Sequence, residues 1–124
     1  AAGCQYCMAH TADSSAKAGI AEEKIAAAFE YESNPLFSDA ERAALGLAQS
    51  AASVPNLASD EDFAELRLYF SEEQIVEIVG VISLFGFLNR WNDTIGTELE
   101  DHPTQFAQKT ITASGWSVGK HTGD

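Results

Sequence analysis

The chain is short of basic residues and of proline. Seven lysines and arginines stand against nineteen aspartates and glutamates, which gives a formal net charge of −12 over 124 residues. Nucleic acids and anionic membranes are bound through clustered positive charge, so this balance argues against both as partners. Only three prolines interrupt an alanine-rich sequence, which favours helices over a β-sandwich or barrel.

Long hydrophobic runs are also scarce. The most apolar stretch, residues 75–88, contains Glu77 and is shorter than the ~20 residues that a membrane-spanning helix requires. We therefore expect a soluble, cytoplasmic protein with no membrane partner. The length is that of one domain, which can bury a core without disulfides or metals. The only methionine is Met8, so we expect either that the N-terminus was processed or that a segment before Ala1 is missing.

Helix start and stop signals recur along the chain and predict an all-α fold of about six helices. Ser38, Ser59 and Ser71 are each followed three residues later by an acidic or amide residue, which is the pattern of a capping box. Gly19 is expected to end the first helix, and His102-Pro103 to end the longest. The expected helices are residues 4–18, 21–31, 38–53, 59–70, 72–99 and 104–112, followed by an irregular tail over 115–121.

The helix expected at residues 72–99 is apolar on most of its sides. Its apolar residues include Ile75, Ile78, Val79, Ile82, Leu84, Phe85 and Leu88. A helix that is apolar nearly all round is usually buried nearly all round, and a protein this small can hardly cover such a helix alone. We therefore expect part of it, or a neighbouring helix, to pack against other subunits.

Cys4 and Cys7 are the feature with the most specific chemistry. Two cysteines three residues apart share one face of a helix, and at its loosened start their sulfurs come within disulfide reach. The partial positive charge of the helix N-terminus is expected to lower a cysteine pKa from about 8.5 into the range of about 3.5–7.5. Since the thiolate is the nucleophile, the pair combines a reactive sulfur with a resolving one.

Other polar and aromatic residues are candidates for the same site. His10 follows Cys7 by three residues, on the same face, where it can donate to a thiolate or relay protons. Tyr6 faces a different side of the helix, and packing is its favoured role, although its hydroxyl is a pocket candidate. Three further residues either line a pocket over the sulfurs or pack in the core or an interface: Asn89, Trp91 and Asn92.

Alternatives to a redox pair are a metal site and a structural disulfide. Cys4 and His10 are about 9 Å apart along a helix axis, so Cys4, Cys7 and His10 do not easily converge on one zinc ion. A fourth ligand, His102 or His121, would also be required, and both are expected at the surface. We therefore expect no metal and no cofactor. A structural disulfide stays open, although so short a loop gains little closure entropy.

The residues around the pair resemble a known family. Residues 3–11, GCQYCMAHT, resemble the motif of the alkylhydroperoxidase-like (AhpD-like), carboxymuconolactone decarboxylase superfamily. Residues 35–45, 70–77 and 89–92 also fit, and residues 115–121 are similar to a peroxidase-related subgroup. The resemblance implies a single all-helical domain over residues 1–124, without the family's N-terminal helix, that assembles into homotrimers or homohexamers.

The resemblance implies an enzyme that reduces peroxides, or a partner's disulfide, through a dithiol cycle. Cys7 would attack the peroxide and become a sulfenic acid, Cys4 would close a disulfide, and His10 would relay protons. An external dithiol or protein thiol would restore the pair. Family members have a helix before the cysteines that often carries a glutamate of the proton relay. Only three residues precede Cys4 here, so we expect this glutamate to lie outside the given sequence.

Two other functions remain as alternatives. Lactone decarboxylases share the family's fold but lack the dithiol, so the pair argues against decarboxylation. The other is a non-catalytic oligomeric helical module that binds a partner or senses redox state, in which the two thiols are buried and inert.

Overall fold

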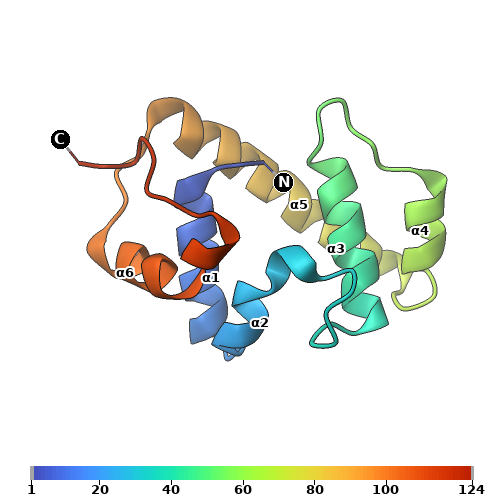
Figure 1. Cartoon of the computed structure of the whole chain (residues 1–124). Helices are drawn as coiled ribbons and strands as arrows, with labels where there is room; N and C mark the ends of the chain where they lie inside the picture. Colours follow the sequence, from blue (N-terminus) through green and yellow to red (C-terminus); the bar gives the residue numbers. More distant parts are fainter. Residues whose placement is uncertain (1, 124) are drawn as a thin grey trace. The chain divides into compact units, whose positions relative to one another are not determined.

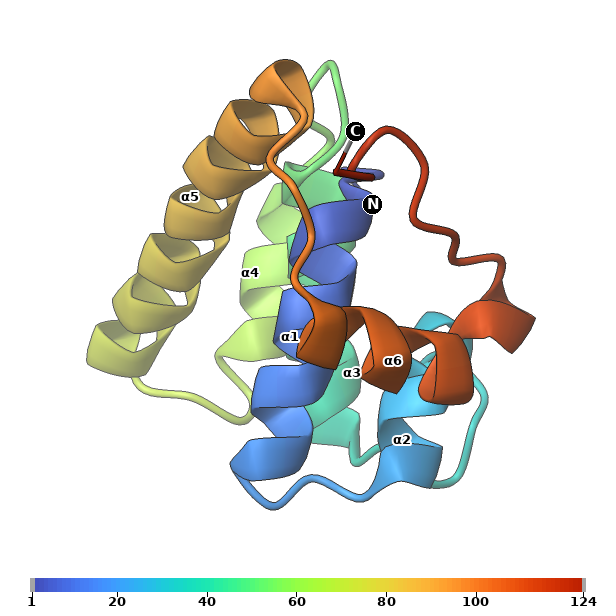
Figure 2. The same ribbon diagram turned by 90° about the vertical axis from the view of Figure 1, so that its left-hand side faces the viewer.

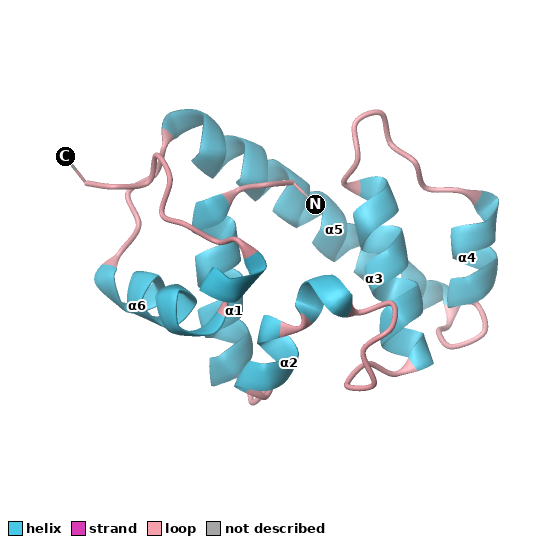
Figure 3. Cartoon of the chain, viewed as in Figure 1, coloured by secondary structure: helices cyan, strands magenta, loops and turns pink. Residues whose placement is uncertain are grey.

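The computed structural model describes residues 2–123, and all its regular elements there are helical (Figure 3). These residues contain six α-helices, two short 3₁₀ helices and no strand, so the all-α prediction is confirmed. The elements are α1 (Gln5–Lys17), α2 (Glu22–Ala26), η1 (Ala28–Glu30), α3 (Asp39–Ala51), α4 (Asp60–Leu66), α5 (Glu72–Ile95), α6 (Asp101–Thr110) and η2 (Thr112–Ser114).

The chain forms two compact units. One unit contains residues 31–87 together with Ala2, and the other contains residues 3–30 and 88 onward. Helix α5 contributes residues to both. Both cysteines belong to the second unit, which we call the cysteine unit.

In the unit of residues 31–87, α3 and α4 pack against each other (Figure 1). Both helices begin with the predicted capping box: the Ser38 amide donates to the Glu41 carboxylate at 2.8 Å, and the Glu41 amide donates to the Ser38 hydroxyl at 3.3 Å. Ser59 and Asp62 repeat this exchange at the start of α4. The buried core of this unit consists of Leu47, Leu66 and Ile75.

In the cysteine unit, α1 and α6 lie side by side (Figures 1 and 2), and α2 contacts both. The buried core here consists of Ala9, Ala12, Leu99, Ala107, Ile111 and Trp116. The indole nitrogen of Trp116 donates to the carbonyl oxygen of Gln5 at 2.9 Å. The C-terminal tail is irregular, as predicted, but this bond and the burial of Trp116 fix it against the first turn of α1.

Helix α5 ends earlier than predicted. It stops at Ile95 because Gly96 adopts a φ of 65°, in the left-handed region that ends helices. A short loop follows, and α6 begins at Asp101 with Pro103 in its first turn, where proline's missing N–H has no helical partner to lose. The prediction that His102-Pro103 ends the long helix is therefore wrong.

Helix α5 is little buried within the single chain, as expected for an apolar helix that a protein this small can hardly cover alone. Its one buried residue is Ile75. Its exposed large apolar residues are Val76, Val79, Val81, Leu84, Phe87, Trp91 and Ile95. By length and composition alone the helix is apolar enough to cross a membrane, a property it shares with core helices of soluble proteins. The single chain thus leaves an apolar helix surface uncovered.

Candidate active site

The two sulfurs lie at the start of α1. Cys4 is the N-cap residue, and its Sγ accepts a hydrogen bond from the backbone amide of Cys7 at 3.3 Å. The two Sγ atoms are 2.7 Å apart, both thiols are free, and the residues are only 2% and 8% exposed. A disulfide bond is about 2.05 Å long, so a small approach of the sulfurs would close the bridge without unwinding the helix.

The electrostatics of the pair differ from the sequence-based expectation. Burial, followed by the hydrogen bond and the charge of Cys4, raises the pKa of Cys7 to about 12, and the Asn92 side chain opposes that rise. The expectation that the helix start lowers a cysteine pKa is therefore wrong for Cys7. Two thiolates this close would repel each other strongly, so the pair keeps at least one proton at neutral pH. The Cys4 sulfur accepts the hydrogen bond of the Cys7 backbone amide at the helix start.

Asn92 is the predicted pocket residue that reaches the sulfurs. Its Nδ2 lies 3.9 Å from Cys7 Sγ and also donates to the carbonyl oxygen of Leu88 at 3.0 Å, while its Oδ1 accepts from the Thr97 hydroxyl at 2.8 Å. These bonds fix the amide with its nitrogen toward the thiol. Of the other two candidates on α5, Asn89 is partly buried and Trp91 is 57% exposed.

His10 has a carboxylate partner that the sequence analysis did not identify. Its Nε2 lies 2.7 Å from Oε2 of Glu100, which immediately precedes α6. The backbone amide of Glu100 lowers the pKa of the Glu100 carboxyl, and hydrogen bonds from the side chains of His10 and Tyr6 add to this effect. The Tyr6 ring packs 4.4 Å from the His10 ring, between centroids, and 5.8 Å from that of His121. Tyr6 therefore neighbours both imidazoles as well as packing on the core.

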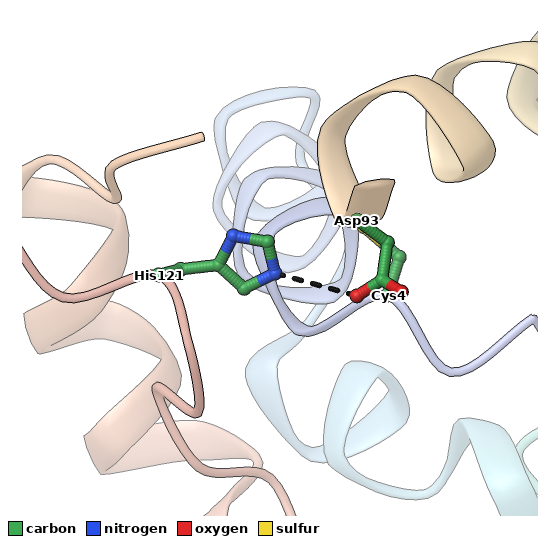
Figure 4. Close-up of side chains that lie close together, drawn as sticks. All are labelled: Cys4, Asp93 and His121. Carbon is green, nitrogen blue, oxygen red and sulfur yellow. Dashed lines mark ion pairs between the residues drawn. The ribbon is translucent and has the colours of Figure 1, made fainter. Parts of the chain in front are cut away.

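His121 is the site residue that the sequence analysis placed wrongly. It was expected at the surface, but its side chain is 1% exposed. Its Nδ1 lies 2.8 Å from the carbonyl oxygen of Thr97, which can only accept, so Nδ1 carries the proton of the neutral ring. Its buried Nε2 makes no hydrogen bond and lies 3.6 Å from Oδ1 of Asp93, on the side where Cys4 also lies (Figure 4).

The unit of residues 31–87 contains a cavity of about 360 Å³. Its lining is aromatic and charged and includes Tyr31, Arg42, Asp62 and Tyr69, but neither a thiol nor an imidazole. Because the nucleophilic and proton-carrying groups lie around Cys4 and Cys7, we assign the candidate chemistry to the cysteine unit.

Comparison with known sequences identifies two bacterial relatives. No protein-family model matches the chain. The chain is 28% identical over 92 residues to the uncharacterized protein YnjA of Escherichia coli (strain K12). The matched residues cover 74% of this chain and 50% of YnjA. The chain is also 32% identical over 92 residues to the uncharacterized protein YdfG of Bacillus subtilis (strain 168). The matched residues cover 73% of this chain and 60% of YdfG. The chain thus spans about half to three fifths of these curated relatives.

Comparison with solved structures identifies an enzyme. The chain superimposes on the debrominase Bmp8 with a TM-score of 0.82 and 36% sequence identity, over 88% of this chain and 59% of Bmp8. A cysteine-to-alanine variant of Bmp8 in complex with 2,3,4-tribromopyrrole gives a TM-score of 0.81 and 34% identity, over 87% of this chain and 58% of that one. The chain is therefore a structural relative of a debrominase and shares its all-α fold.

Proposed function

We propose that the chain is a thiol-dependent reductase of the AhpD-like superfamily, in which Cys4 and Cys7 together give two electrons to a peroxide. The observation that carries this proposal is the pair itself: two free sulfurs 2.7 Å apart, buried at a helix start, with the Asn92 amide beside one of them. Such a pair can be oxidised to a disulfide and reduced again with little change in the backbone.

In the proposed first step, Cys7 attacks the outer oxygen of a hydroperoxide. The step starts from the form of the pair that holds a single proton, on Cys7. The Cys4 thiolate takes this proton across 2.7 Å, the O–O bond breaks, and Cys7 becomes a sulfenic acid. The departing alkoxide takes a proton from His10, which Glu100 holds in position. Asn92, whose hydrogen bond lowers the pKa of Cys7, stabilises the charge that develops on the attacking sulfur.

In the second step, Cys4 gives its proton to the departing sulfenic hydroxyl and attacks the sulfenic sulfur, which closes the disulfide and releases water. The sum is two thiols and one hydroperoxide converted to one disulfide, one alcohol and one water. An external dithiol or a protein thiol, in the cytoplasm, would reduce the pair for the next cycle.

Reductive dehalogenation is a second candidate, and the similarity to the debrominase Bmp8 favours it. The same two thiols would convert a carbon–bromine bond of an aromatic substrate to a carbon–hydrogen bond, with release of hydrogen bromide and closure of the disulfide. Both reactions draw two electrons from one pair, so the sulfur geometry supports each of them and substrate assays separate them.

We also propose that the protein works as a homotrimer or homohexamer. The exposed apolar residues of α5, among them Val81, Leu84 and Phe87, would be covered by other copies of the chain. Support comes from the gathering of exposed large apolar side chains on one helix, because exposed apolar patches mark interaction sites on proteins.

The test is turnover by the purified, reduced chain supplied with excess dithiol. Alkyl hydroperoxide and 2,3,4-tribromopyrrole are offered in separate assays, and loss of dithiol and formation of product are followed. Turnover of either substrate should vanish in Cys7→Ser and fall in His10→Ala, while His102→Ala, which changes an exposed histidine, serves as the control. A Cys7→Ser variant with full turnover would contradict the proposal.

A further inference from the structure

Three potential metal ligands, one of them a thiol of the cysteine pair, lie close together (Figure 4). Cys4 lies at the start of α1, Asp93 near the end of α5, and His121 in the C-terminal tail. One ligand atom from each side chain lies within 4.8 Å of the other two. We propose that Cys4, Asp93 and His121 form a zinc-binding site that exists only while the cysteine pair is reduced.

His121 is oriented as a metal-binding imidazole. The Thr97 carbonyl oxygen accepts the Nδ1 proton at 2.8 Å, which fixes the ring and leaves Nε2 with a free lone pair. Histidine ligands of zinc are typically held in this way through their second nitrogen. Nε2 is buried without a hydrogen-bond partner, and such atoms are rare because leaving them unsatisfied costs free energy. A bound ion would satisfy this atom.

Asp93 supplies the second ligand and an approach from solvent. Its Oδ2 pairs with the Lys120 ammonium at 3.1 Å, and its Oδ1 lies 3.6 Å from Nε2 of His121. In a tetrahedral zinc site with bonds of about 2.0–2.3 Å, ligand atoms are roughly 3.3–3.7 Å apart. The carboxylate and the imidazole already have this separation. The side chain of Asp93 is 44% exposed, so an ion can reach the cluster from water.

Cys4 completes the set and determines both the metal and the redox dependence. A thiolate, an imidazole and a carboxylate suit zinc, whereas magnesium and calcium take all-oxygen sites. Zinc binds Cys4 as a thiolate, so the thiol proton is released on binding. Formation of the Cys4–Cys7 disulfide consumes the same sulfur. Zinc binding and disulfide formation therefore exclude each other, and zinc would keep the pair reduced.

This site differs from the one that the sequence analysis considered and rejected. That set combined Cys4, Cys7 and His10, which do not easily converge on one ion, with His102 or His121 as a fourth ligand. The present site keeps Cys4 and His121 and adds Asp93, and three protein ligands leave a fourth position for water. The inference does not require the peroxide or bromopyrrole reaction.

The test measures zinc affinity of the full chain by competition with a chromophoric chelator. The reduced protein should bind one zinc ion, and the disulfide form about tenfold or more weakly. His121→Gln and Asp93→Asn should weaken binding to the same degree, and His102→Ala should leave it unchanged. Substitution of Co²⁺ should produce thiolate-to-cobalt charge-transfer absorption that is absent from Cys4→Ser.

Equal affinity in the reduced protein, the disulfide form and the Asp93→Asn variant would overturn the site. Asp93 is half-exposed, so its variant remains informative if the buried His121→Gln variant fails to fold, which thermal unfolding monitors. Turnover is assayed separately in zinc-free buffer with chelator. Turnover without zinc binding overturns the metal site alone, and zinc binding without turnover overturns the proposed reaction alone.

Discussion

The substitution Cys4→Ser tests how the two sulfurs share charge. In the pair, burial, and then the hydrogen bond and charge of Cys4, raise the pKa of Cys7 to about 12. Serine is a good N-cap residue and keeps a hydrogen-bond acceptor for the Cys7 amide, but it carries no negative charge. The pKa of Cys7 should therefore fall below 12 in the variant, while burial keeps it above the ordinary value of a cysteine.

The size of the effect follows from the thiolate fraction. With a pKa of about 12, Cys7 is ionised in about one molecule in ten thousand at pH 8, and each unit by which the pKa falls raises that fraction about tenfold. Because the thiolate is the reacting form, alkylation of Cys7 at pH 8 should accelerate by about one order of magnitude or more.

The assay is the rate of iodoacetamide labelling at pH 8, with peptide mapping to locate the adduct. The parent chain and the variant are compared in the folded state, and both are compared with the same proteins in denaturant, where each thiol reacts as a free cysteine. If Cys7 in the folded variant reacts no faster than Cys7 in the folded parent, Cys4 does not raise its pKa.

Three further predictions concern stability and assembly. In urea unfolding, the free energy of unfolding of Cys4→Ala should be about 0.5–2 kcal/mol lower than that of Cys4→Ser, because only serine preserves the N-cap acceptor. Equal urea midpoints would exclude a capping role. Asp13→Asn should be less stable than the parent at pH 7, because the hydrogen bond from Lys17 lowers the pKa of Asp13 and the ionised carboxylate stabilises the fold. This stabilisation is present above the pKa of Asp13 in the unfolded chain, about 3.9, and is lost as pH falls through the lower pKa of the folded chain. The free energies of unfolding of parent and variant, measured in urea, should therefore converge in acid. A difference that stays constant with pH would refute this linkage. Leu84→Glu, on the exposed apolar surface of α5, should reduce the mass measured by light scattering to that of one chain, whereas an unchanged mass would remove this surface from the interface.

The sequence predicted the features that depend on neighbouring residues. The capping boxes at Ser38 and Ser59 form as predicted, because each exchanges hydrogen bonds within four consecutive residues. The closeness of Cys4 and Cys7 likewise follows from helical spacing. All of these are properties of a single turn of chain.

The remaining features depend on contacts between distant segments. His10 meets Glu100 across 90 positions, and His121 is buried because its carbonyl oxygen accepts the Leu99 amide at 2.9 Å and its ring bonds to Thr97. A histidine in a glycine-rich tail carries no periodic signal of such burial. The raised pKa of Cys7 also depends on tertiary packing, because burial, its largest cause, outweighs the preference of a helix start for a thiolate, and the neighbouring Cys4 sulfur adds to it.

Intact mass spectrometry of the reduced chain after one equivalent of alkyl hydroperoxide provides the decisive observation on the dithiol cycle. The parent should lose the mass of two hydrogens and become resistant to alkylation at both cysteines, and Cys4→Ser should instead stop at a sulfenic acid on Cys7 that dimedone traps. A parent chain that keeps its mass, with Cys4 and Cys7 both still open to alkylation after unfolding, would contradict peroxide reduction by the pair.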